Sequence, residues 1–268
     1  MMIHTPSSLK IIHDNAGFFS CSSVRLDNIV RYFNHYKYLP PILDTSPLYT
    51  MYKPLDRNNR DQDITHEYFI TTGDEIKYVG DILYDMTYQY LDYKTLDYEK
   101  ICPFVRKYFS PTQKIRDIIR GVEKQYSLDY KNICVLFYRG NDKETETPIC
   151  GYNDFIVRAR EIQKATPQIR FLIQSDETEF INTMTAEFPT NSFYFNNMIR
   201  HMYKCATNSV DKVFPNSNYT YSKYFLAITI IMSKCKHVLC MTGNCSLWIA
   251  LYRENAHNFQ QFMNTTWV

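Results

Sequence analysis

The amino-acid sequence predicts an α/β fold whose second half is built on a mainly parallel sheet. Two observations carry this prediction: short apolar runs that suit buried strands, and longer segments with helical patterning that alternate with them. A series of this kind requires parallel strands joined by right-handed crossovers. The expected strands cover residues 133–137, 169–174, 192–195 and 237–241, and the expected helices cover residues 152–164, 177–188, 222–234 and 245–253.

The first half of the chain is less regular. Asp27 is a good cap for a helix that places Ile29, Val30 and Phe33 on one apolar stripe. Polar, tyrosine-rich stretches separate the other predicted elements. In chain order we expect a strand over 9–13, a loop over 14–26, a helix over 28–36, a strand over 42–44, a surface loop over 52–66 and two short strands within 68–98.

A predicted helix marks the boundary between the two halves. Ser110, Pro111 and Thr112 begin this helix, which runs to about Tyr126. We therefore expect an N-terminal domain over residues 1–110 and a C-terminal domain over residues 111–268. We expect the tail of the second domain to pack back toward the first.

Composition restricts the classes of function. The chain has 268 residues, of which 45% are hydrophobic, so it can bury a sizeable core. Its formal net charge of +2 is too small to indicate bulk electrostatic binding to nucleic acid. We expect small-molecule partners, no nucleic acid and no separate cofactor.

The eight cysteines indicate a reducing compartment. None belongs to a Cys-x-x-Cys pair, and several lie within apolar runs that suit core strands. Cys235, Cys240 and Cys245 are evenly spaced, but they fall on three different elements, so a zinc site is the minor alternative. With no signal peptide and no apolar stretch near 18 residues, we expect a soluble, cytoplasmic protein.

The most informative segment follows the first strand of the second half. The apolar run over 133–137 is succeeded at once by polar residues, and in open α/β sheets ligands bind just beyond the carboxyl ends of the strands. The planar fork of an arginine there suits phosphate oxygens, and a glycine lets the backbone approach a ligand. The plainer alternative is a turn in which Arg139 pairs with Asp142. The expected ligand contacts of this segment are Tyr138, Arg139, Gly140, Asp142 and Lys143.

Two further strand ends carry polar side chains. The strand over 169–174 is followed by Ser175 and Asp176, either of which also suits a helix cap. After the strand over 237–241 comes a small polar loop that opens a helix, where free backbone N–H groups and the helix dipole favour a phosphate. The expected contacts in this loop are Thr242, Gly243, Asn244, Cys245 and Ser246.

The usual glycine-rich nucleotide motifs are missing from the sequence. There is no Gly-x-Gly-x-x-Gly after a strand and no Gly-x-x-x-x-Gly-Lys-Ser/Thr. Phosphates would then be held by arginine and by helix N-termini, which points to nucleotide-sugar enzymes that use no metal.

Three stretches resemble the fucosyltransferases, in the order in which those enzymes carry them. Residues 232–251 resemble the C-terminal motif of the α-1,2-fucosyltransferase family, and residues 137–146 resemble the His-x-Arg-Arg-x-Asp-Lys motif of the wider superfamily. Residues 171–177 resemble that superfamily's strand followed by Ser/Thr-Asp. The matching residues are Arg139, Asp142, Lys143, Ser175, Asp176, Ser233, Cys235, His237, Ser246 and Trp248.

The resemblance implies a GT-B-like architecture, with two Rossmann-like domains facing a cleft. It implies an inverting, metal-independent glycosyltransferase that transfers fucose from GDP-fucose to a glycan hydroxyl. Two positions depart from the pattern, because Phe137 stands where the superfamily has His, and Ile228 stands at about the place of its guanine-reading Asp. Another nucleotide sugar, a catalytically inactive binding protein and a scaffold subunit are therefore the alternatives.

The resemblance also suggests where a general base for the acceptor would lie. Glu146 follows the phosphate-binding turn at an offset one residue shorter than that of the α-1,6 enzymes, and Glu144 is the second candidate. On the acceptor side, His13 is the expected catalytic contact at the end of the first strand. The other expected acceptor-side contacts are Asp14, Asn15 and Gly17.

Overall fold

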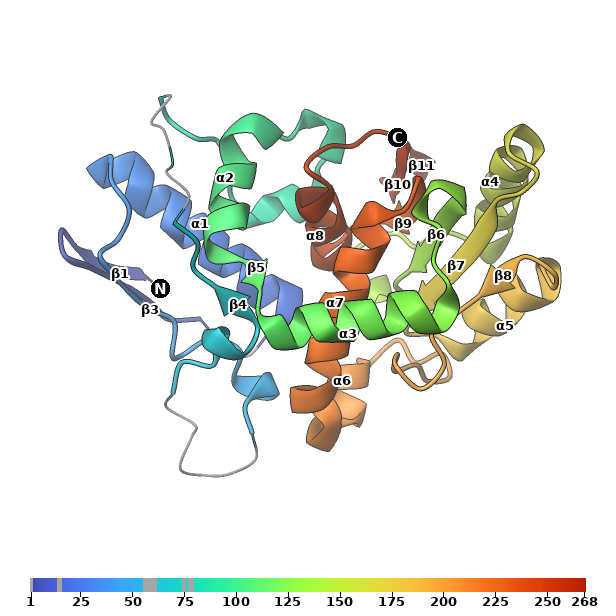
Figure 1. Cartoon of the computed structure of the whole chain (residues 1–268), viewed down its shortest axis with the longest axis horizontal. Coiled ribbons are helices and arrows are strands. Elements are labelled where there is room, and N and C mark those ends of the chain that lie inside the picture. Colours follow the sequence, from blue (N-terminus) through green and yellow to red (C-terminus); the bar gives the residue numbers. More distant parts are fainter. Residues whose placement is uncertain (1, 14–15, 55–61, 74–75, 77–79) are drawn as a thin grey trace.

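The computed structural model describes residues 2–13, 16–54, 62–73, 76 and 80–268. Its main feature is a six-stranded sheet in the second half, with strand order β11-β10-β9-β6-β7-β8 (Figure 1). All neighbours in this sheet are parallel except β10 and β11. The strands are β6 (Ile133–Tyr138), β7 (Arg170–Ser175), β8 (Ser192–Phe193), β9 (His237–Met241), β10 (Phe259–Met263) and β11 (Thr266–Trp267).

The register of the sheet brings three strand ends together. Phe137 of β6 lies opposite Gln174 of β7 and opposite Cys240 of β9. Since the three strands are parallel, the polar residues that follow them meet at one edge. The predicted α/β class is confirmed.

Helices cover both faces of this sheet. α4 (Tyr152–Ala165) and α5 (Thr178–Glu187) pack on one face, where Phe155 and Phe180 contact the side chain of Tyr138. Side chains alternate along a strand, so Phe137 faces the opposite way. On that side α7 (Asn218–Lys234) packs against α3 (Gln113–Tyr126) and α8 (Asn244–Arg253), and the four-residue α6 (Val210–Val213) precedes α7.

The first half contains a smaller sheet. β2 (Ser8–Ile11) lies between β1 (Met2–Thr5), which is antiparallel to it, and β3 (Ile42–Asp44), which is parallel. The long helix α1 (Phe18–Tyr36) connects β2 to β3, which makes one β-α-β unit. The remaining elements are α2 (Tyr98–Tyr108) and a short antiparallel pair, β4 (Phe69–Ile70) with β5 (Ser110–Pro111).

The structure corrects several sequence predictions in detail. Residues 18–26 were expected in a loop but form the first half of α1, and residues 12 and 13 lie beyond the end of β2. Only one short strand, β4, occurs in the described part of residues 68–98. β10 and β11 were not predicted, and residues 55–61 of the expected surface loop over 52–66 lie outside the described residues.

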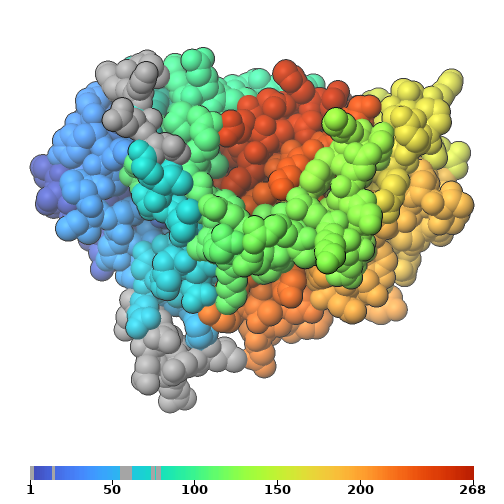
Figure 2. Space-filling view, viewed as in Figure 1, coloured from blue at the N-terminus to red at the C-terminus, as the bar shows by residue number. Residues whose placement is uncertain are grey.

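Helix α8 joins the two halves. The indole of Trp248 is fully buried, and its ring centroid lies 4.6 Å from that of Phe109 and 6.1 Å from that of Phe19. Its Nε1 donates a hydrogen bond to Ser23 Oγ of α1 at 3.0 Å. In the space-filling view the C-terminal residues in red lie directly against residues 80–110 in green (Figure 2). The division into domains 1–110 and 111–268 stays a prediction.

Lys223 of α7 is a buried cation. Its Nζ lies 3.4 Å from Glu67 Oε2 and donates to the carbonyl oxygen of Tyr219 at 3.1 Å. Burial, together with nearby Lys114 and against the opposing effect of Glu67, lowers the pKa of Lys223 from 10.5 to about 8. The charged form is therefore destabilised in the folded chain.

This shift predicts a pH dependence of stability. Between pH 8 and pH 10.5 the unfolded chain holds the Lys223 proton more tightly than the folded chain does, so the free energy of unfolding should rise with pH across that range. Below pH 8 the whole penalty applies, about 3 kcal/mol for a shift of this size. Lys223→Met should remove this rise, and urea denaturation at pH 7 and pH 9.5 measures it. Identical profiles for the two proteins would contradict the prediction.

Candidate functional site

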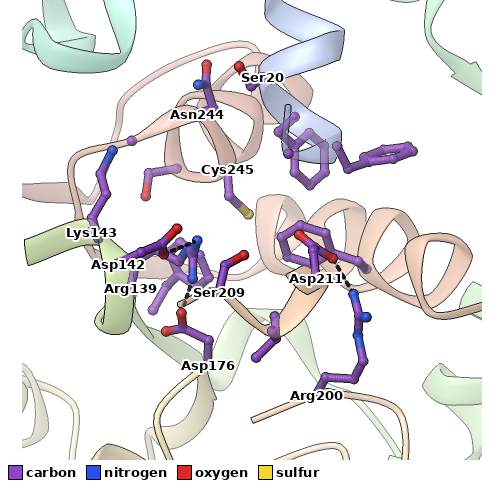
Figure 3. A pocket seen from close by; sticks show the side chains of 18 of the residues that line it. Ser20, Arg139, Asp142, Lys143, Asp176, Arg200, Ser209, Asp211, Asn244 and Cys245 are labelled. Carbon is purple, nitrogen blue, oxygen red and sulfur yellow. Dashed lines mark hydrogen bonds and ion pairs between the residues drawn. The ribbon is translucent and has the colours of Figure 1, made fainter. Parts of the chain in front are cut away.

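A cavity of about 550 Å³, called the pocket below, lies at the carboxyl ends of β6, β7 and β9. Residues from both halves of the chain form its walls. Figure 3 shows Arg139, Asp142 and Asp176 on one side of it, Arg200 and Asp211 on another, and Ser20 of α1 facing Asn244 of α8. The expected site residues that line it are Gly17, Arg139, Asp142, Lys143, Glu146, Ser175, Asp176, Thr242, Gly243, Asn244, Cys245 and Ser246.

Arg139 is held between two carboxylates. One nitrogen of its guanidinium donates to Asp176 Oδ2, and the other lies 3.2 Å from Asp142 Oδ1. Asp176 also accepts a hydrogen bond at 3.0 Å from the backbone N–H of Gly140. The expected pairing with Asp142 is thus present, and the side chain of Arg139 still lines the pocket. Because both partners fix the guanidinium, its remaining N–H groups are already oriented for a ligand.

Gly140 and Tyr138 are not among the described residues that line the pocket. A Cβ on Gly140 would lie 1.9 Å from Glu177 Oε1, whose carboxylate also accepts the Asn141 N–H at 2.8 Å. Glycine is therefore needed there to make room for a buried carboxylate. The Tyr138 ring stacks on Phe180 with a centroid distance of 4.6 Å, on the opposite face of the sheet from the pocket. The expected ligand contacts at these two positions are corrected accordingly.

Lys143 is buried beside the start of α8. Its Nζ lies 2.5 Å from Glu146 Oε2 and 5.2 Å from the centroid of the Tyr90 ring. Gly243 has a φ of 147°, and a Cβ there would lie 3.4 Å from Lys143 Nζ. The ammonium group thus lies next to the first turn of α8, where the helix dipole favours an anion.

The side chains of the loop before α8 are used within the protein. Thr242 donates to the carbonyl oxygen of Gln89, Ser246 donates to that of Met241, and Asn244 bonds to both Gln89 and Ser23. The backbone N–H groups of residues 244–246 have no acceptor among the described residues. A ligand would therefore be bound by these N–H groups. Burial raises the pKa of the Cys245 thiol to about 12, so this group is neutral near pH 7.

A second helix N-terminus faces the same pocket. α1 begins after Gly17 without a side-chain cap, and residues 17–20 line the pocket. The N–H of Phe18 donates to Tyr52 Oη at 2.7 Å, whereas those of Phe19 and Ser20 have no acceptor among the described residues. The positive ends of two helix dipoles, one from each half, therefore converge on one cavity.

Arg200 and Asp211 are pocket residues that the sequence analysis missed. Arg200 Nη2 lies 2.5 Å from Asp211 Oδ1, and Asp211 Oδ2 accepts a hydrogen bond at 2.9 Å from the hydroxyl of Tyr52. Arg200 lies in the irregular segment after β8 and Asp211 lies in the short helix α6, so no strand end marked either residue. The chain of bonds from Arg200 to Tyr52 links the second half to the first turn of α1.

The charges on the pocket walls balance. Four cationic side chains and four carboxylates line the described part of the pocket. Attraction for an anion must therefore come from local donors and the two helix ends rather than from an excess of positive charge. The cations are Arg139, Lys143, Arg200 and Lys212, and the carboxylates are Asp142, Glu146, Asp176 and Asp211.

The remaining wall is apolar. Its residues include Phe137 of β6, Phe225 and Ile228 of α7, and Met198 and Ile199 of the segment before α6. The pocket therefore combines a polar end that suits phosphates with an apolar end that suits a ring.

The other candidate bases lie away from the described pocket lining or outside the described residues. Glu144 is exposed and lies 3.5 Å from Lys204, and neither Glu144 nor His13 is among the described residues that line the pocket. Asp14 and Asn15 lie outside the described residues. Glu146 lines the pocket, where its carboxylate pairs with Lys143 and accepts a hydrogen bond at 3.3 Å from the hydroxyl of Tyr90.

All eight cysteines are free, and seven of them are buried. Cys205 is the partly exposed one, and its backbone N–H donates to Asn141 Oδ1 at 2.9 Å. Hydrogen bonds from Thr207 and Asn208 lower the pKa of its thiol. Within the described ranges no three His, Cys, Asp or Glu side chains cluster as metal ligands, and Cys235, Cys240 and Cys245 form no such group.

The described helices include none with the length and apolar character needed to span a membrane. No protein-family model and no curated protein sequence matches the chain.

Solved structures of the α-1,6-fucosyltransferase NodZ are similar to this chain. The form co-crystallised with GDP has a TM-score of 0.44 and 12% identity, over 63% of this chain and 51% of that one. The form soaked with GDP-fucose has a TM-score of 0.40 and 11% identity, over 64% and 53%. The structure of NodZ from Bradyrhizobium has a TM-score of 0.42 and 11% identity, over 65% and 51%. The chain spans about half the length of these proteins.

Proposed function

We propose that the pocket binds a nucleotide sugar and that the chain transfers the sugar to a hydroxyl group of an acceptor glycan. One observation carries this proposal: Arg139, Lys143 and the uncapped start of α8 meet in one cavity at the carboxyl ends of three parallel strands. Such fixed donors would stabilise the negative charge that develops on a leaving diphosphate. They would do so without a metal ion, which fits an inverting transfer.

The donor that we favour is GDP-fucose, because the motifs that contain Arg139 and Ser246 resemble those of fucosyltransferases. The apolar end of the pocket leaves the choice of base open, since Phe137 and Ile228 offer no hydrogen bond to a guanine. A transferase that uses a different nucleotide sugar is therefore the alternative, and a catalytically inactive binding protein is another.

Through Lys143, binding of the nucleotide-sugar donor would activate the residue that accepts the proton of the acceptor hydroxyl. In the structure its ammonium group is neutralised by Glu146, 2.5 Å away. A phosphate at the start of α8 would compete with Glu146 for this ammonium. The carboxylate released in this way is our proposed general base for the acceptor hydroxyl, and the exposed position of Glu146 gives an acceptor access to it.

A binding screen followed by a turnover assay tests the proposal. GDP, UDP, ADP and CDP are titrated by calorimetry, and the sugar derivatives of whichever nucleotide binds are then tested for transfer and hydrolysis. We expect one nucleotide to bind at micromolar concentration and its sugar to be transferred in excess EDTA. Binding without any turnover would support the inactive alternative. Absence of nucleotide binding would exclude the proposal.

Glu146→Gln should lower turnover by about 100-fold or more, because the amide keeps the shape of the side chain but removes the base. Donor affinity should stay within a few-fold, since the base faces the acceptor. Glu144→Gln is the matched control, because Glu144 is as exposed as Glu146 but pairs with Lys204 and is not among the described residues that line the pocket. Steady-state kinetics of both variants test the assignment of Glu146 as the general base. If both stay active, the base is another residue, and Asp211 is the next carboxylate to test.

A further inference from the structure

The pocket contains a buried amide that has no partner. Gln174 of β7 lines the pocket and is 5% exposed. Its Oε1 is buried without a hydrogen-bond partner. No described residue accepts a hydrogen bond from its Nε2. A flip of the amide by 180° exchanges Oε1 and Nε2, and the buried atom is again left without a hydrogen-bond partner.

A second glutamine shows how the chain treats an amide that is purely structural. Gln261 of β10 is 2% exposed, and its side chain accepts from Tyr93 N at 3.1 Å and donates to Leu91 O and Thr242 Oγ1, both at 3.0 Å. Buried polar groups in folded proteins are nearly always bonded in this way. The two amides differ in location, because Gln174 faces the pocket and Gln261 is not among the described lining residues.

The apolar side chains on this wall of the pocket favour a flat ligand group beside Gln174. Its neighbour across the sheet is Phe137, and Phe225 and Ile228 of α7 also line the pocket. Arg139 lies two residues beyond Phe137, which is roughly 7 Å at the rise of an extended strand. A nucleotide whose phosphates contact Arg139 would therefore place its base, one ribose away, near Gln174.

We propose that the Gln174 amide recognises the hydrogen-bonding edge of the nucleobase of the donor, an inference that rests on the proposed function above. An amide presents one donor beside one acceptor. It therefore pairs with an edge that offers one acceptor beside one donor, as adenine, uracil and the O6/N1–H side of guanine do. The two adjacent N–H donors of guanine require a carboxylate instead. A site that uses Gln174 therefore recognises a different hydrogen-bonding edge of the base than a site that uses an aspartate.

Gln174→Met separates a ligand contact from a structural role. Methionine has a similar length and no amide, so the best-binding nucleoside diphosphate should bind at least about tenfold more weakly, a loss of about 1.4 kcal/mol. Pyrophosphate, which has no base, should bind within twofold of its affinity for the wild type. The Tm of the free protein should not fall, because the change removes an unbonded amide. In the matched variant Gln261→Met the Tm should fall by at least about 2–4 °C.

Calorimetry with GDP, UDP, ADP, CDP and pyrophosphate, together with thermal melts, gives all of these readouts. Equal nucleotide affinity for wild type and Gln174→Met would overturn the inference but not the proposed function. An equal loss for pyrophosphate would mean that the amide acts on the phosphates, and would overturn it too. If the wild type binds no nucleotide, both proposals fail. Should Gln174→Met fail to fold, Gln174→Asn withdraws the amide by one methylene, and the same loss of base-dependent affinity is expected.

Discussion

Arg139→Ala should lower the turnover of the nucleotide-sugar donor by about 100- to 1000-fold. That is the usual cost of removing one preorganised donor to a developing negative charge. Arg139 follows the carboxyl end of β6 and lines the pocket, and two carboxylates fix its orientation before any ligand arrives. Arg139→Lys keeps the charge but loses the fork, so its turnover should fall between those of the alanine variant and the wild type.

The same substitution should also destabilise the fold, and this effect must be separated from catalysis. The Asp176 side chain is only 6% exposed, so without Arg139 it becomes a buried carboxylate with no cation beside it. Breaking a buried pair in this way typically costs about 3–5 kcal/mol. The double variant Arg139→Ala, Asp176→Asn should recover much of that stability and none of the turnover. Turnover within a few-fold of the wild type in either variant would show that Arg139 has no phosphate role.

Trp248→Ala should lower the free energy of unfolding by about 3–5 kcal/mol, as expected for the loss of a large, fully buried aromatic side chain. Its indole contacts Phe19 and Phe109 from the first half of the chain, so the cavity would open where the two halves meet. Urea denaturation of the wild type and the variant measures the loss.

Two matched variants divide that loss into packing and hydrogen bonding. Trp248→Phe keeps most of the aromatic contact and removes the bond from Nε1 to Ser23, so it should cost clearly less than alanine. Ser23→Ala leaves the indole in place with a buried, unbonded N–H, which should cost about 1–3 kcal/mol. A loss below about 1 kcal/mol for Trp248→Ala would mean that α8 does not hold the halves together.

The second half of the fold could be predicted because each element has a local signal. The run over 133–137 is apolar throughout, as a strand buried on both faces must be, and the polar cluster after it marks its end. The start of α1 gave no such signal. In the structure residues 21–27 are all buried, although Ser22, Ser23, Arg25 and Asp27 are polar, so no amphipathic stripe distinguishes that turn from a loop.

The site was predictable only where it follows regular strands. Arg139 and Lys143 were found because they come directly after an apolar run, and the loop over 242–246 was found for the same reason. Arg200 comes from an irregular segment and Asp211 from the four-residue helix α6, and their approach to the pocket depends on tertiary packing with Tyr52. For Gln174, a missing partner can be recognised only once every neighbour has a position.

Cys205 gives the protein a chemically addressable position that needs no engineering. The other seven thiols are buried, and the hydrogen bonds that favour the thiolate of Cys205 make it the most reactive toward a maleimide dye. The backbone of Cys205 is bonded to Asn141, two residues from Arg139, so a fluorophore attached there would lie beside the phosphate-binding turn. Labelling the wild-type chain at one site would therefore convert ligand binding into an optical signal, including for variants that have lost turnover.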